Sequence, residues 1–177
     1  MDRRRFIHTT ASITLAAAAA GADAANAETA KRKPAMPNYI EPVTALITDW
    51  RRKDIKSVLS RVTDDIAWHT HVGSPPVNGK PAMEQMLNTL ATQMSDVRWR
   101  IFHYAQNENR IFLEGVDDFV NPEGRRVVIP YAGVLTFRGA LISEWRDYFD
   151  RTLFNKLKAG EPAPDYIDAL TVRKALF

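Results

Sequence analysis

The sequence contains no cysteine among its 177 residues. This absence excludes disulfide bonds, thiolate metal ligands and thiol nucleophiles, so the fold must be stable by packing alone. Neither sign of charge is in large excess, because 24 lysines and arginines face 21 aspartates and glutamates. A chain this close to neutral gives no indication of a nucleic-acid or membrane-binding surface.

The sequence also lacks an apolar run of the roughly 18 residues that a membrane-spanning helix needs. Its alanine-rich run covers only residues 11–20, after three arginines at positions 3–5 and before a small-x-small site at 25–27. This order is typical of a twin-arginine signal peptide; a cytosolic amphipathic N-terminus and an uncleaved anchor are the alternatives. We expect the twin-arginine translocase to export the folded chain and residues 1–27 to be removed. The result would be a periplasmic or secreted protein with no membrane attachment.

The remaining residues, 28–177, have about the length of one domain with one core. A flexible leader is predicted over residues 28–38, because the basic cluster at 31–33 stands next to a proline. The domain itself is expected over residues 39–158. The tail, residues 159–177, is expected either to act as a lid over the domain or to contact a partner subunit.

Hydrophobic periodicity divides this domain into helices followed by strands. Apolar residues recur at three- and four-residue spacings over residues 39–59 and 81–94, which predicts helices. A strand is predicted between them at 64–72, and after Ser95 the pattern changes to four successive strands separated by turn residues. Helices followed by an antiparallel meander predict an α+β architecture.

Two aspartates, Asp117 and Asp147, stand in stretches that otherwise have the composition of buried strands. A carboxylate on the inward face of a strand costs several kcal/mol unless it is paired or functional. Two of them on facing strands indicate an acid/base pocket, although a purely structural pair is the alternative. Asp118 alternates with Asp117 and is expected to be solvated, whereas Asp150 is expected to cap a following helix.

Three motifs carry a resemblance to a known family: the hexapeptide WRDYFD at residues 145–150, the pair Phe102-His103, and the run from Glu114 to Asp117. Together with the order of elements they resemble the limonene-1,2-epoxide hydrolases, over about residues 40–154. That family belongs to the NTF2-like superfamily of cone-shaped domains, with ketosteroid isomerase, scytalone dehydratase and the polyketide cyclases. The resemblance implies a curved antiparallel or mixed sheet around N-terminal helices, one open-ended pocket for a small hydrophobic molecule, no cofactor, and a homodimer.

The resemblance also implies a set of site residues. In the family, one aspartate acts as acid on the epoxide oxygen, an arginine bridges to a second aspartate, and the second aspartate takes a proton from water. Asp117 falls at the acid position and Asp147 at the base position. The arginine position holds Gly115, while the family's water-binding tyrosine and asparagine correspond to Trp68 and Thr70.

These departures change the expected pocket. Gly115 shares a strand face with Asp117, so the missing arginine is expected to leave a hole that could admit a larger substrate or another cation. Without that arginine, the two carboxyls are expected to share a proton, with one pKa raised. The remaining positioning residues expected in the pocket are Tyr131, which could supply a replacement hydroxyl, and Ile129, Trp145 and Phe149.

A His-x-His pair at His69 and His71 has the spacing of two metal ligands. Alternation points both away from the face of Trp68 and Thr70, and no third ligand stands nearby, so no metal is expected. Epoxide hydrolysis is therefore the leading hypothesis from the sequence. The alternatives are an isomerase, cyclase or dehydratase that uses one aspartate as base, and a non-catalytic carrier of a hydrophobic ligand.

Overall fold

The structure, a computed structural model, describes residues 37–177. The expected signal peptide and most of the expected leader lie outside the described residues. The described helices are α1 (Ile40–Arg51), α2 (Ile55–Ser60), α3 (Lys80–Gln93), α4 (Arg151–Ala159) and α5 (Asp165–Val172). The strands are β1 (Val62–His69), β2 (Val77–Asn78), β3 (Arg100–Asn107), β4 (Arg110–Val120), β5 (Arg126–Arg138) and β6 (Leu141–Phe149). In this part of the chain, no helix has the length and apolarity needed to cross a membrane.

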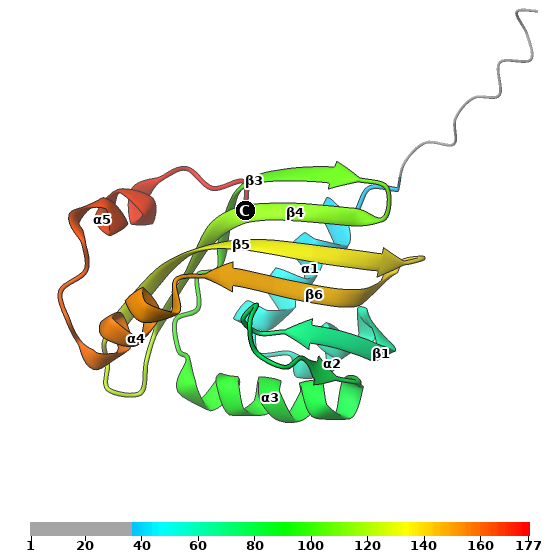
Figure 1. The fold of residues 1–177 in the computed structure, drawn as a ribbon, viewed down its shortest axis with the longest axis horizontal. Helices are drawn as coiled ribbons and strands as arrows, with labels where there is room; N and C mark the ends of the chain where they lie inside the picture. The colour runs from blue at the N-terminus through cyan, green and yellow to red at the C-terminus, as the bar shows by residue number, and fades with distance from the viewer. Residues whose placement is uncertain (1–36) are drawn as a thin grey trace, which may run out of the picture. The chain divides into compact units, whose positions relative to one another are not determined.

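All the strands form one curved sheet in the order β2-β1-β6-β5-β4-β3 (Figure 1). Strands β3 to β6 make the antiparallel meander that the sequence predicts. Strand β1 joins the sheet by pairing in parallel with β6, so the sheet is mixed. The predicted α+β architecture of helices against a curved sheet is thus confirmed.

The main core lies between helices α1 to α3 and one face of the sheet, which we call the inner face. Apolar residues of α1 recur every three or four positions, and alternate residues of each strand point toward them. Burial of these side chains supplies the main stabilisation of a fold that has no covalent crosslink. The largest fully buried members include Leu46, Ile47, Ile66, Met83 and Ile142.

Strand register decides which polar side chains share the inner face. Asp117 on β4 stands opposite Ile129 on β5, and Asp147 on β6 stands opposite Gly133 on β5. Because positions 129 and 133 are four apart on one strand, they point to the same face. The two aspartates therefore project from β4 and β6 toward the same side, with β5 between them.

The C-terminal tail packs on the opposite, outer face of the sheet. Ile167 of α5 is buried against Phe102, Val116 and Val128 of strands β3, β4 and β5. Beyond the helix, the amide N–H of Leu176 donates to the carbonyl of Ile101 at 2.8 Å. The tail thus covers part of its own outer face and, unlike a lid, contributes no residue to the cavity described below.

Replacing Ile167 by alanine should lower the free energy of unfolding by about 2–4 kcal/mol, because it removes the buried anchor of α5 and leaves a cavity. Chemical denaturation monitored by circular dichroism measures this change. Tyr166→Ala is the matched control, since Tyr166 is 58% exposed and its loss should change stability by less than about 0.5 kcal/mol. Equal stability of the two variants would show that α5 is not anchored on the sheet.

Candidate active site

A cavity of about 220 Å³ lies between the inner face of the sheet and helices α1, α3 and α4. Its walls are mostly aliphatic and aromatic, and its volume is below the range of drug-sized pockets, so it suits a small apolar molecule. The lining residues that can form hydrogen bonds or carry charge include Trp68, Thr70, His71, Asp117, Asp147 and Arg151.

Asp147 is held by two indole groups. The Nε1–H of Trp145 donates to its Oδ1 at 2.8 Å, and the Nε1–H of Trp68 lies 3.4 Å from its Oδ2. The ring centroids of Trp68 and Trp145 are 5.2 Å apart, so packing fixes both donors. Because an indole donates but cannot accept, this arrangement orients the carboxyl and favours its ionised form.

Asp117 faces the same cavity without such support. Among residues 37–177, no protein group donates a hydrogen bond to its carboxyl, which leaves both oxygens available to a ligand or water. Burial, with a smaller effect from the charge of Asp118, raises the pKa of Asp117 to about 7. Burial, and then the charge of Asp117, raise the pKa of Asp147 to about 8, although the two indole donors lower it. Near neutral pH the pair can therefore hold one proton between them.

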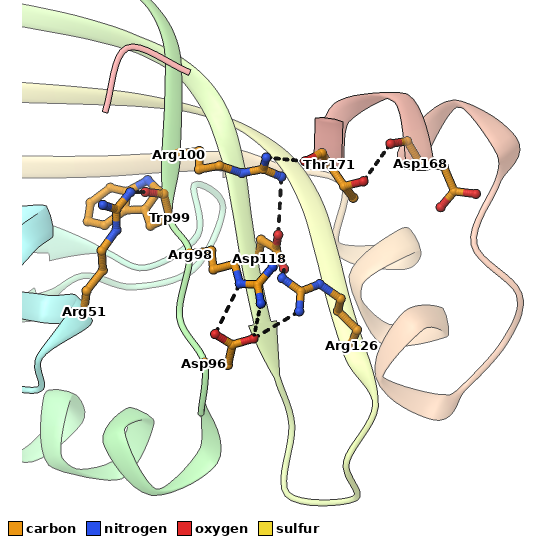
Figure 2. Close-up of polar contacts among 9 residues, drawn as sticks. All are labelled: Arg51, Asp96, Arg98, Trp99, Arg100, Asp118, Arg126, Asp168 and Thr171. Atoms are coloured by element: carbon orange, nitrogen blue, oxygen red, sulfur yellow. Dashed lines mark hydrogen bonds and ion pairs between the residues drawn. The ribbon is translucent and has the colours of Figure 1, made fainter. Parts of the chain in front are cut away.

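Asp118, on the other face of β4, is buried rather than solvated, so the prediction from alternation is wrong there (Figure 2). Its carboxylate lies 2.5 Å from Nη2 of Arg126 and 3.3 Å from Nη2 of Arg100. Arg100 also donates to the carbonyl of Thr171 at the end of α5. The arginine side chains and the docked tail cover this part of the outer face, which alternation along a single strand cannot reveal.

Gly115 leaves no hole beside Asp117, contrary to the expectation from the sequence. A Cβ atom at this position would lie 2.1 Å from the carbonyl oxygen of Arg100 and 3.1 Å from the ring of Tyr131. The backbone of β3 and the tyrosine ring thus occupy the space. Gly133 leaves room for the other edge of the same ring, because a Cβ atom at position 133 would lie 3.1 Å from it. A glycine within a strand often marks such a close backbone approach.

Tyr131 lies on the inner face behind the cavity wall, whereas its strand neighbour Ile129 lines the cavity. The Tyr131 hydroxyl accepts a hydrogen bond from Nε1–H of Trp99. Burial, with added effects from the charges of Asp117 and Asp147, raises the pKa of the Tyr131 hydroxyl well above its ordinary value. Tyr131 therefore stays protonated near the two carboxyls but does not line the cavity, so it does not supply the replacement hydroxyl that we expected inside the pocket.

Trp99 is a site residue that the sequence did not single out. It lines the cavity, and its ring stacks on Trp145 at 5.5 Å between centroids. Arg51 donates to its carbonyl at 2.5 Å (Figure 2). The only signal in the sequence is an aromatic residue at the start of a predicted strand, which equally fits ordinary core packing.

The prediction that both histidines point away from the pocket is wrong for His71. Strand β1 ends at His69, so alternation stops there, and Thr70 and His71 both line the cavity. His71 packs against Phe149, another predicted lining residue, with ring centroids 4.9 Å apart. His69 instead lies 3.9 Å from Glu144. In the described part of the chain, no group of three potential ligands could hold a metal ion.

The predicted cap at Asp150 is confirmed, because its Oδ1 accepts from the backbone N–H groups of Thr152 at 2.8 Å and Leu153 at 3.0 Å. This cap starts α4 directly after β6 and brings Arg151 and Phe154 to the cavity. Neither lining residue was expected from the sequence, since the turn from strand to helix decides their direction.

Solved structures with the same fold include an NTF2-like protein of unknown function from Burkholderia pseudomallei, with 19% identity and a TM-score of 0.62 over 69% of this chain and 98% of that one. An LEH-like epoxide hydrolase of M. tuberculosis is 22% identical, with a TM-score of 0.60 over 67% of this chain and 87% of that one. SalBIII, an epoxide hydrolase/cyclase-like enzyme of pyran ring formation in salinomycin, is 18% identical, with a TM-score of 0.59 over 64% and 92%.

At these identities the similarities show the fold, which is that of the NTF2-like cone-shaped domains. A family model described as the SnoaL-like domain matches residues 43–145, more than half of the chain. The chain therefore belongs to the SnoaL-like domain family.

Gly115→Ala should destabilise the protein by about 1–3 kcal/mol or more, because its methyl group would collide with backbone rather than with a movable side chain. Gly115→Arg, the residue that the resemblance to the limonene-1,2-epoxide hydrolases implies at this position, should fail to fold for the same reason. Thermal unfolding measures both. Ala132→Val, on the exposed face of β5, is the control and should be nearly neutral. A stable, folded Gly115→Arg protein would contradict the close approach of β3.

Asp117→Asn and Asp147→Asn should each stabilise the protein by about 1–3 kcal/mol at pH 9, and much less at pH 4. The folded pKa values of about 7 and 8 exceed that of an unfolded aspartate, so these carboxyls favour the folded state below about pH 4 and lose that contribution as the pH rises to about 8. Urea denaturation at both pH values measures the difference, with the exposed Asp168→Asn as control. Destabilisation at pH 9 would show that the aspartates are structurally paired.

Proposed function

We propose that this protein hydrolyses an epoxide on a small hydrophobic molecule, without a cofactor, in the manner of the limonene-1,2-epoxide hydrolases. One observation carries the proposal: two carboxyls with raised pKa values face a single apolar cavity, one fixed by two indole donors and the other unpartnered. Opening an epoxide with water needs an acid and a base at the same time, and a carboxyl pair that shares a proton supplies both.

The resemblance to the limonene-1,2-epoxide hydrolases assigns the two roles, with Asp117 as the acid and Asp147 as the base. The pKa of Asp147, about 8, is above that of Asp117, about 7, so the shared proton lies more on Asp147 in the free protein. The indole N–H groups reduce this preference because they favour the ionised form of Asp147, and the reaction starts when the proton is on Asp117. Asp117 then donates this proton to the epoxide oxygen while a C–O bond of the ring breaks. Asp147 accepts a proton from the water whose oxygen forms the new C–O bond. The product is a diol, and transfer of the proton from Asp147 back to Asp117 restores the starting state.

The cavity walls supply positioning. Thr70 occupies the position of the water-binding asparagine of the limonene-1,2-epoxide hydrolases, and its hydroxyl would hold the attacking water. Trp68 and Trp145 orient Asp147, and Ile129 and Phe149 provide apolar surface for the substrate. The backbone of β3 occupies the position of the bridging arginine, so the two carboxyls must share one proton without an arginine between them.

A second candidate is an isomerase, cyclase or dehydratase. The favouring observation is the unpartnered carboxyl of Asp117, whose pKa near 7 suits a single residue that removes and returns a proton. Such a reaction would need Asp117 and would tolerate loss of Asp147. A carrier function would need neither aspartate for turnover, because the wild type would show none.

Export and pairing are part of the same proposal. The twin-arginine signal would place the mature chain in the periplasm or outside the cell. A homodimer would form through the outer face of the sheet, where Tyr148 is 42% exposed and Arg146 lies two residues before it on β6.

Incubation of the purified protein with limonene oxide and a panel of small epoxides in ¹⁸O-labelled water should yield diols that carry one labelled oxygen, as read by mass spectrometry. Asp117→Asn and Asp147→Asn should each lower the rate by about a hundredfold or more, because each removes the acid or the base. Asp168→Asn, far from the cavity, should retain full activity. Turnover that survives both substitutions at the pair would refute acid/base hydrolysis. If the wild type yields no diol from any epoxide, the isomerase, cyclase or carrier alternatives are favoured instead.

A further inference from the structure

The cavity carries a cation where it meets solvent. Among the described residues that line the cavity, Arg151 is the single arginine or lysine, and its exposure to solvent places it at the opening. In the part of the chain that the structure describes, its guanidinium forms no ion pair and no hydrogen bond to protein. The adjacent carboxylate of Asp150 is engaged in capping α4. An unpaired guanidinium beside an apolar cavity is available to a ligand.

The local geometry brings Arg151 beside a row of rings on the cavity wall. Arg151 and Phe154 are three residues apart on α4, so their side chains lie on neighbouring parts of one helix face. Phe154 packs on Phe149 at 5.4 Å between centroids, and Phe149 packs on His71 at 4.9 Å. All four residues line the cavity, so an apolar ligand in contact with these rings would end close to the guanidinium.

A second polar group on this wall also lacks a partner. The Nδ1 atom of His71 is buried and, among residues 37–177, has no hydrogen-bond partner. Buried polar atoms are rarely left unsatisfied, so such an atom on a cavity wall indicates a bound water or a polar ligand group. Together, Arg151 and His71 place two polar groups beside the rings of Phe149 and Phe154 on this wall of the cavity.

The reactive end of the cavity does not oppose an anionic ligand. The pKa values of about 7 and 8 mean that Asp117 and Asp147 together carry less than one full negative charge at pH 7. Arg151 is exposed on α4, whereas Asp117 and Asp147 are only partly exposed on the inner face of the sheet, so the cation lies nearer to solvent than the pair does. A ligand can therefore meet the cation at one end and the acid/base pair at the other.

We infer that the substrate is a hydrophobic carboxylic acid, whose apolar body fills the cavity and whose carboxylate binds Arg151 at the opening. A guanidinium matches a carboxylate with two parallel N–H···O bonds, which gives orientation as well as affinity. The reactive group of the acid then points inward to Asp117 and Asp147. This inference deepens the proposed function and rests on it for the reaction, whereas the binding mode can be measured without turnover.

The test compares two probes that share a carbon skeleton, perillic acid and perillyl alcohol, by isothermal titration calorimetry on the purified protein. Arg151→Gln should weaken binding of the acid by about fivefold or more and change binding of the alcohol by less than about twofold. Arg151→Lys should retain much of the acid affinity, since it keeps the charge. Lys156→Gln removes a charge from the same helix outside the cavity and should affect neither probe. Added salt should weaken binding of the acid, but not of the alcohol, to the wild-type protein.

Equal loss of affinity for both probes in Arg151→Gln, or no loss for the acid, would overturn the inference. A wild type that binds the alcohol but rejects the acid would do the same. These results are independent of the hydrolysis assay. If the aspartate variants keep full turnover while Arg151→Gln selectively lowers the affinity for the acid, the proposed reaction is refuted and the proposed binding mode is supported. If turnover needs the aspartates while Arg151→Gln is not selective, the reaction stands and the inference fails.

Discussion

The burial of two carboxyl groups in one apolar cavity is the constraint on which the rest of the site depends. Each would cost several kcal/mol as an isolated charge, so the protein must either neutralise them or supply donors. It does both, because the pair can share a proton and two indoles bind Asp147. The surrounding aromatic residues then serve the carboxyls as well as the core: Trp99 stacks on one indole and binds the hydroxyl of Tyr131.

The site differs from the one that the resemblance to the limonene-1,2-epoxide hydrolases implies, because the place of the bridging arginine is filled rather than left as a hole. Where a bridging arginine is expected, β3 lies against Gly115 and the ring of Tyr131 covers the gap. No arginine side chain therefore bridges the two carboxyls from this position, and burial keeps both pKa values high. A site of this kind is poised for proton transfer near neutral pH but has little means to stabilise a fully ionised pair.

Much of the fold and the inner face could be predicted from the sequence, because strand alternation is a local property. It identified Asp117, Asp147, Trp68 and Ile129 as facing one side, and the structure places all of them on the cavity. Alternation failed for His71, since β1 had already ended.

Other features depend on segments distant in the sequence, and no local pattern carries them. The parallel pairing of β1 with β6 is one, as is the backbone of β3 over Gly115. The burial of Asp118 is another, because it requires two arginines and the returning C-terminal tail. Each of these contacts forms only in the folded sheet, between segments that are far apart in the sequence. The composition of a single strand therefore does not predict it.

Asp117 and Asp118 are consecutive residues on opposite faces of β4, and their surroundings are chemically opposite. Asp117 faces a largely apolar cavity that disfavours its charged form, and Asp118 faces two arginines with which its charged form pairs. Removing one member of a buried ion pair leaves the other uncompensated, at a cost that can reach about 3–5 kcal/mol. We therefore expect these three positions, Arg100, Asp118 and Arg126, to vary together among relatives. Relatives should keep all three residues or replace all three with apolar residues, and a substitution of one alone should be rare.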